Sequence, residues 1–195
     1  GHRVPARTFE HVLKMNYARY RLGVSATWRR RDGLDETWDW HLGPIVHKVT
    51  TDRMVGDYIQ VPWSTRLSDK MFMIRTQLSV PRLVNAIASS SPYNQWLSEE
   101  LIKGAEVGRK VLLCTHRINQ LEDIRRRILS SGRNFTVGVY AGKANGRTLK
   151  QSELEGAKKC QIILATFHKM QEGTDIADLD TLYLATPASD IEQVV

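Results

Sequence analysis

The chain has 195 residues, of which 42% are hydrophobic and 25% are charged, the proportions of an ordinary globular protein. No apolar run approaches the roughly 20 residues that cross a bilayer, and no charged start leads into an apolar segment, so neither a membrane span nor a secretory signal is predicted. The net charge of +7 favours a polyanionic partner such as nucleic acid, although a solvated basic surface is an alternative. Because the chain starts with Gly1 rather than Met and stops within a helical pattern, we expect a fragment.

The first third of the chain predicts short elements. Residues 8–17 carry apolar side chains at helical spacing, and "YRLGVSAT" at 20–27 is typical of a buried strand that runs into a turn. A second helix is predicted over 34–42, where Gly and Pro follow. Residues 45–49 and 57–63 are predicted to form short strands.

The rest of the chain has a regular alternation of helices and strands. Two helices are predicted between residues 79 and 108, and the elements expected after them are a strand at 110–115, a helix at 118–132, a strand at 135–140, a helix at 148–159, and strands at 160–166 and 181–186. Continuously apolar strands that alternate with helices predict a parallel sheet covered on both faces. Ligands of such sheets bind at the carboxyl ends of the strands. We therefore expect the loops after Thr115, Thr166 and Thr186 to share one functional edge.

The two cysteines, Cys114 and Cys160, are far apart in the sequence and lie in or beside apolar runs. Their spacing fits neither a metal knuckle nor a disulfide framework. We expect both to be buried, reduced thiols in a cytoplasmic protein, because that compartment keeps thiols reduced.

Several polar stretches are candidates for chemistry, but each has a plain alternative. The hydroxyls of Ser25–Thr27 can link two sites by short hydrogen bonds or can simply cap a turn. Thr115 and Arg117 place a hydroxyl and a guanidinium directly after a strand, where they can hold a phosphate. Gly173 lets backbone approach a ligand and Asp175 can accept from a sugar hydroxyl, although Gly followed by Asp is also a common turn. There is no Gly-rich phosphate loop and no metal cluster in the sequence.

Taken in order, these stretches resemble the motifs of the superfamily 2 helicases of the DEAD/DEAH type, with most similarity to the branch of XPB-type and phage-encoded DNA helicases. "GHRVPARTF" resembles the end of the Asp-Glu-x-His box, and "RLGVSATWRRRDGLD" resembles motif III with its sequel. "KVLLCTHRINQLEDI" resembles motif IV, and "ILATFHKMQEGTDIADLDTLYLATP" resembles motif V. "SDIEQVV" resembles the approach to motif VI. The resemblance covers nearly the whole chain.

This resemblance implies two RecA-like α/β lobes, each a parallel sheet with helices on both faces. Residues 1–44 would be the end of lobe 1, and residues 45–195 would be most of lobe 2. ATP would lie between the lobes and a nucleic-acid strand across both. The phosphate loop and the Asp-Glu pair that holds Mg²⁺ would lie upstream, so no metal ligand is expected in this chain, and motif VI with its arginine fingers would lie downstream.

The resemblance also implies a role for each matching position. His2 would belong to the catalytic site and couple it to motif III, whose Ser25, Ala26 and Thr27 would relay the state of the nucleotide. The residues implied to contact nucleic acid are Thr115, Arg117, Thr166 and His168, and those implied to face ATP are Gly173, Asp175 and Gln193.

The function implied is that of an ATP-dependent DNA helicase or translocase in the cytoplasm of a bacterial or phage-infected cell, with ATP and Mg²⁺ as cofactors and DNA, or else RNA, as partner. Residues 1–195 alone are expected to be inactive, because the phosphate loop and the arginine fingers are not among them. The alternatives are an RNA helicase, a motor subunit of a restriction or repair complex, and a non-catalytic nucleic-acid-binding module.

Overall fold

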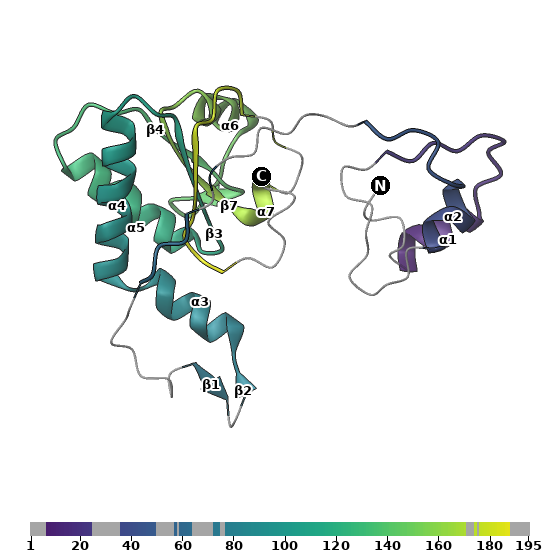
Figure 1. Ribbon diagram of the computed structural model, residues 1–195, viewed down its shortest axis with the longest axis horizontal. Helices are drawn as coiled ribbons and strands as arrows, with labels where there is room; N and C mark the ends of the chain where they lie inside the picture. The colour runs from purple at the N-terminus through teal and green to yellow at the C-terminus, as the bar shows by residue number, and fades with distance from the viewer. Residues whose placement is uncertain are drawn as a thin grey trace. The chain divides into compact units, whose positions relative to one another are not determined.

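The computed structural model describes residues 7–24, 36–49, 57, 59–63, 72–74, 77–170, 174 and 176–187 (Figure 1). Two compact units make up the chain, residues 1–64 and residues 65–195. The expected division into residues 1–44 and 45–195 concerns the lobes of a larger fold and stays a prediction.

In the first unit, the described residues form two short helices, α1 (Arg7–Lys14) and α2 (Glu36–Leu42). Gly43 follows α2 with a φ of +83°, a left-handed conformation that often ends a helix and that glycine adopts without strain. Both helices were predicted, although α1 ends at Lys14 rather than at Tyr17.

The strands predicted for the first unit are not formed by its described residues. Residues 20–24, 45–49 and 59–63 have no regular secondary structure. Their apolar side chains are largely exposed, Leu22 by 84% and Val46 by 87%. A strand needs a neighbouring strand to pair its backbone groups, and the described part of this unit contains none. The strand predictions are therefore wrong at these positions, whereas Ser25–Thr27 lie outside the described residues.

The second unit is built on a four-stranded parallel sheet. Its strands, in spatial order, are β4 (Val137–Tyr140), β7 (Ile162–Thr166), β3 (Val111–Thr115) and β8 (Thr181–Leu184). All four were predicted as strands, with ends that differ by one or a few residues.

Helices and two small hairpins complete the second unit. The helices are α3 (Val80–Ala88), α4 (Ser91–Glu106), α5 (Ile118–Ser130), α6 (Gln151–Lys158) and α7 (Phe167–Met170). The hairpins are β1 (Met73–Ile74) with β2 (Gln77–Leu78), and β5 (Lys143–Ala144) with β6 (Arg147–Thr148). Among the described residues, no helix is long and apolar enough to cross a membrane.

The sheet is buried on both faces because helices cover each of them. Figure 1 shows α4 and α5 on one side of the sheet and α6 and α7 on the other. Alternate residues of β3 point to opposite faces, so that Val111 and Leu113 pack with α4 and α5, whereas Leu112 and Cys114 pack with the α6 and α7 side. This arrangement is the predicted α/β class and matches a RecA-like fold.

The two cysteines differ in their environment. Cys114 is buried within β3, and burial raises the pKa of its thiol to about 12. Cys160 is half-buried, because it lies in the turn between α6 and β7. The prediction of a buried thiol is therefore confirmed for Cys114 and wrong for Cys160. Both thiols are free.

The contact between α6 and β4 at Gly138 gives a test of this packing. A Cβ atom added at Gly138 of β4 would lie 2.6 Å from the Cα atom of Ala157 in α6, whereas one added at Gly142 would meet nothing within 4 Å. Gly138→Ala should therefore push α6 off the sheet and lower the free energy of unfolding by about 1–3 kcal/mol. Gly142→Ala, the matched control, should change it by less than about 1 kcal/mol. Urea denaturation measures both, and equal stabilities of the two variants would contradict this packing.

Candidate functional site

The carboxyl ends of β3, β7 and β8 meet at one edge of the sheet. Thr115 and Thr166, the last residues of β3 and β7, are direct neighbours in the parallel register. β8 lies on the other side of β3, and the hydroxyl of Thr186 just beyond it accepts the backbone N–H of His116 at 3.1 Å. The expectation that these three loops share an edge is confirmed. We call this the carboxyl edge.

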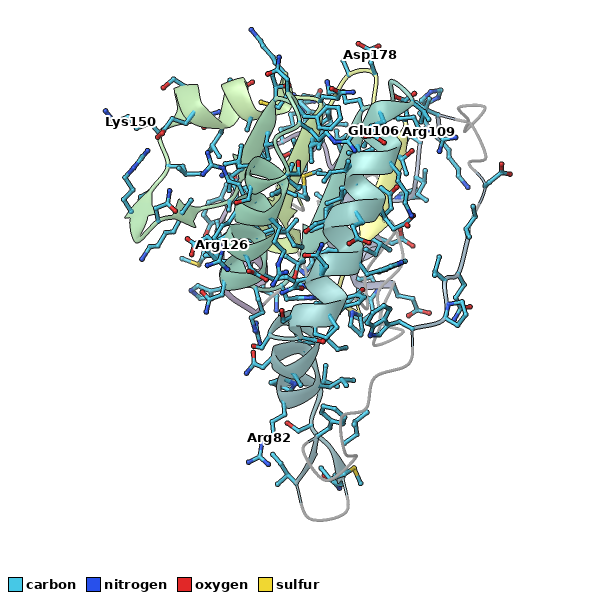
Figure 2. The ribbon with its side chains drawn as sticks, turned by 90° about the vertical axis from the view of Figure 1, so that its left-hand side faces the viewer. Arg82, Glu106, Arg109, Arg126, Lys150 and Asp178 are labelled. Atoms are coloured by element: carbon cyan, nitrogen blue, oxygen red, sulfur yellow. The ribbon has the colours of Figure 1, made fainter. Side chains whose placement is uncertain are left out.

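The opposite end of the sheet is the amino edge, where β3 and β8 begin. Figure 2 shows Glu106, Arg109 and Asp178 together at that end, with Arg82 of α3 toward the other end. Lys110 makes two polar contacts at the amino edge: its backbone N–H donates to Asp180 at 2.7 Å, and its ammonium donates to the carbonyl of Ala177 at 2.8 Å.

At the carboxyl edge, Thr115 is completely buried. Its hydroxyl donates to Oε1 of Gln120 at 2.5 Å and accepts the backbone N–H of Arg117 at 3.3 Å. With these two hydrogen bonds, the buried Thr115 hydroxyl fixes the turn between β3 and α5. Its implied contact with nucleic acid stays a prediction.

Gln120 continues a buried polar chain between α4 and α5. It is completely buried on α5, and its side-chain N–H donates to Oδ1 of Asn94 on α4 at 2.9 Å. Asn94 in turn donates to the Asp123 carboxylate and to the carbonyl of Ala88, each at 3.0 Å. The turn after β3 is thus tied to three helices through side chains that have no access to water.

Asp123 is the charged end of this chain. Burial raises the pKa of its carboxyl group, but hydrogen bonds from Arg127, Arg126 and Asn94 outweigh burial and hold the pKa below its ordinary value. The carboxylate is therefore ionised at neutral pH, and Nε of Arg127 pairs with it at 3.0 Å.

Arg117 follows Thr115 and is half-buried. Its Nε donates to Oδ1 of Asn85 on α3 at 2.5 Å, and Nη1 donates to the carbonyl of His116 at 3.4 Å. The guanidinium is therefore held in one place beside the carboxyl edge, as a residue that binds a phosphate requires.

His116 is a further residue of the edge that was not among the predicted site residues. Its ring lies against the buried ring of Phe167, with 4.5 Å between centroids and 39° between planes, and its Nδ1 is 2.9 Å from Oγ1 of Thr186. Burial, and then the positive charge of Arg117, lower the pKa of His116 below its ordinary value. The only hint in the sequence was its place between two predicted site residues.

After β7, helix α7 begins at once. Thr166 is 9% exposed at the strand end, and His168 is exposed in the first turn of α7. Farther along this segment the hydroxyls of Thr174 and Tyr140, the last residue of β4, are 2.9 Å apart. The structure therefore brings Thr115, Arg117, Thr166 and His168 to one edge.

The other predicted site residues are not placed. His2, Ser25, Ala26, Thr27, Gly173, Asp175 and Gln193 lie outside the described residues.

The chemistry of the carboxyl edge suits an anion. The described residues that directly follow the strands are 116–117, 141–142, 167–170 and 185–187, and they include Arg and Lys but no Asp or Glu. Hydroxyl, imidazole, guanidinium and backbone N–H groups are the donors that contact phosphates. Among the described residues, no group of three or more His, Cys, Asp or Glu side chains fits a metal ion.

The buried polar chain predicts an unequal response to the same substitution. Gln120→Leu removes the partner of two buried groups, Thr115 and Asn94, and should lower the free energy of unfolding by about 2–3 kcal/mol. Gln151→Leu, on the exposed face of α6, should change it by no more than about 0.5 kcal/mol. The midpoints of urea denaturation measure the difference, and a Gln120→Leu variant as stable as Gln151→Leu would show that the chain does not hold the turn.

The comparisons with known proteins agree with the motifs. No protein-family model matches the chain. A protein of Acanthamoeba polyphaga mimivirus that is named an ATP-dependent RNA helicase is 28% identical over 100% of this chain and 38% of its own length. A protein of Escherichia phage T5 that is named a helicase is 20% identical over 95% of this chain and 40% of its own length.

One solved structure, that of T4 UvsW, matches 55% of this chain over 22% of its own length, with 17% identity and a TM-score of 0.45. The chain spans about two fifths of the length of the two curated relatives. The resemblance to helicases is confirmed by these relatives, since practically the whole chain is similar to a segment of proteins named helicases.

Proposed function

We propose that the protein is an ATP-dependent helicase or translocase of superfamily 2, which couples ATP hydrolysis between two RecA-like lobes to movement along DNA. The observation that carries the proposal is the carboxyl edge, where Thr115 of motif IV and Thr166 of motif V, the last residues of β3 and β7, are neighbours in one parallel sheet. The loops that follow them carry cationic and neutral donors and no carboxylate within the described residues.

The proposed task of this edge is to hold the phosphate backbone of a strand. Arg117 would bind a phosphate from its position beside α3, and Thr166 and His168 would bind from the start of α7. A motor of this kind grips the backbone with each lobe and changes the affinity of the two grips in turn as the lobes close and open. The net charge of +7 supports a polyanionic partner.

Hydrolysis of Mg²⁺-bound ATP would supply the free energy for this cycle. The residues proposed to face the nucleotide, Gly173, Asp175 and Gln193, and the coupling residues His2 and Ser25–Thr27 lie outside the described residues. The Mg²⁺ ligands are proposed to lie upstream of residue 1, and no group of His, Cys, Asp and Glu among the described residues fits a metal ion.

The lobes are part of the proposal. We propose that residues 1–44 complete lobe 1 and that residues 45–195 form most of lobe 2. The exposed apolar side chains of the first unit, such as Leu22 and Val46, are consistent with a segment whose sheet partners belong to the rest of a lobe. We place the protein in the cytoplasm of a host cell, in keeping with its two free thiols.

A second candidate substrate is RNA, which is favoured by the name of the mimivirus relative. Labelled single strands of DNA and RNA with one sequence, compared at one salt concentration, separate the two. The motor subunit of a restriction or repair complex uses the same machinery and is distinguished by its partner subunits. The sequence of the complete gene distinguishes a motor from a non-catalytic binding module. A motor requires a Gly-Lys-Ser/Thr loop upstream and a Gly-Arg-x-x-Arg motif downstream, whereas a binding module requires neither.

The nucleotide role of motif V predicts the outcome of one pair of variants in the complete protein. Asp175→Ala should lower strand-stimulated ATP turnover about tenfold or more, because a hydrogen bond to the ribose is lost, while the melting temperature stays unchanged. Asp57→Ala, at an exposed position of the first unit, should turn over ATP like the wild type. Steady-state hydrolysis measures both. Wild-type turnover by the Asp175→Ala variant would contradict the nucleotide role of Asp175. Absence of turnover in the wild-type protein would contradict the proposed motor function.

A further inference from the structure

His116 is held at the carboxyl edge by three contacts, two of which involve its ring. Its backbone N–H donates to Oγ1 of Thr186 at 3.1 Å, its Nδ1 is 2.9 Å from the same oxygen, and one part of the ring packs on Phe167. Phe167 is 3% exposed and Thr186 is 3% exposed, whereas His116 itself is exposed. The buried residues Phe167 and Thr186 thus hold an imidazole ring that solvent can reach.

The hydrogen bonds of Thr186 assign the tautomer of this ring. The hydroxyl oxygen already accepts the backbone N–H of His116, and no other described residue accepts its hydrogen. A buried hydroxyl hydrogen without an acceptor is costly, so we assign the bond as Thr186 O–H donating to Nδ1. A neutral ring that accepts at Nδ1 carries its hydrogen on Nε2. The lowered pKa of His116 agrees with a neutral ring at pH 7.

The Nε2–H group is therefore a free donor of fixed direction. None of the described residues accepts from it, and the ring it belongs to is exposed. The guanidinium of Arg117 is near enough for its charge to lower the pKa of His116, and it is anchored to Asn85 at 2.5 Å. A donor that is already oriented loses little conformational entropy when it binds. Hydrogen bonds to anionic phosphate oxygens are stronger than those to neutral acceptors. The positive charge of Arg117 would attract such an anion to this position.

We propose that His116 contacts the bound nucleic-acid strand by donating Nε2–H to a phosphate oxygen, and that Thr186 is the residue that positions it. This inference rests on the proposed function, because it adds a contact to the same edge. It differs from the contact of Arg117 in one measurable respect: a neutral donor releases no counterion from the strand, whereas a guanidinium does.

The experiment is a salt series of strand binding by the complete protein, followed by fluorescence anisotropy with a labelled single-stranded oligonucleotide. His116→Phe keeps a ring on Phe167 but has no donor, and it should bind about tenfold more weakly at every salt concentration, with the slope of log K against log salt unchanged. His116→Gln places an amide N–H near the position of Nε2 and should recover part of the loss. Arg117→Ala, the charged comparison, should reduce the slope by about 0.7–0.9.

The positioning role of Thr186 is tested in the same assay. Thr186→Val removes the hydroxyl but keeps the shape of the side chain, and it should weaken binding severalfold with an unchanged slope. Thr186→Ser keeps the hydroxyl and should restore wild-type affinity. Equal affinities of the Val and Ser variants would overturn the positioning role.

The outcomes separate this inference from the proposed function. A wild-type protein that binds the strand and hydrolyses ATP, together with a His116→Phe variant of wild-type affinity, would overturn the His116 contact alone. A weaker His116→Phe variant with a slope reduced like that of Arg117→Ala would overturn the neutral donor. Failure of the wild type to bind any strand would overturn both proposals. If His116→Phe melts at a lower temperature than the wild type, His116→Gln and the Thr186 pair decide the result.

Discussion

The pairing of β3 with β7 in a sheet that is buried on both faces is the constraint on which the rest of the second unit depends. Each residue from Val111 to Thr115 lies beside its counterpart from Ile162 to Thr166, and both strands are apolar until their final threonines. A parallel register brings the two strand ends together, and full burial leaves the side chains between them no contact with water. Polar side chains that follow β3 and β7 can therefore reach solvent only beyond the ends of these strands. At the amino edge Lys110 bonds to Asp180 and Ala177, whereas the carboxyl edge exposes His116 and His168.

Buried side chains fix the loops that follow β3 and β8 at the carboxyl edge. The buried hydrogen bonds from Thr115 through Gln120 to Asn94 connect the turn after β3 with α4 and α5. Thr186 and Phe167 orient the ring of His116 in the same turn. Buried polar groups whose hydrogen bonds are all made specify one arrangement of the elements that carry them. A motor that must grip a backbone at a fixed step benefits from such rigidity, because donors that are placed in advance bind without a further cost in entropy.

Much of this second unit was predictable, because its strands are long apolar runs between amphipathic helices and each pattern indicates one element. The common edge of Thr115 and Thr166 followed from the parallel topology alone. The supporting contacts did not follow, since Gln120 and Asn94 are separated by 26 residues and His116 and Thr186 by 70, and only the packing of helices and strands brings them together. In the first unit the same kind of apolar run misled the prediction. Residues 20–24 have the composition of a strand but no partner strand among the described residues, so their side chains are exposed.

The central claim is that the carboxyl edge is the face that meets nucleic acid. Hydrogen–deuterium exchange of the complete protein, with and without a single-stranded oligonucleotide, tests it most directly because it compares the two edges of one sheet in one sample. The account predicts slower amide exchange at residues 116–118, 167–170 and 185–186 when the strand is bound, and unchanged exchange at residues 108–110 and 178–180 of the amino edge. Protection that is confined to the amino edge, or that is absent from both edges while the strand is bound, would contradict it.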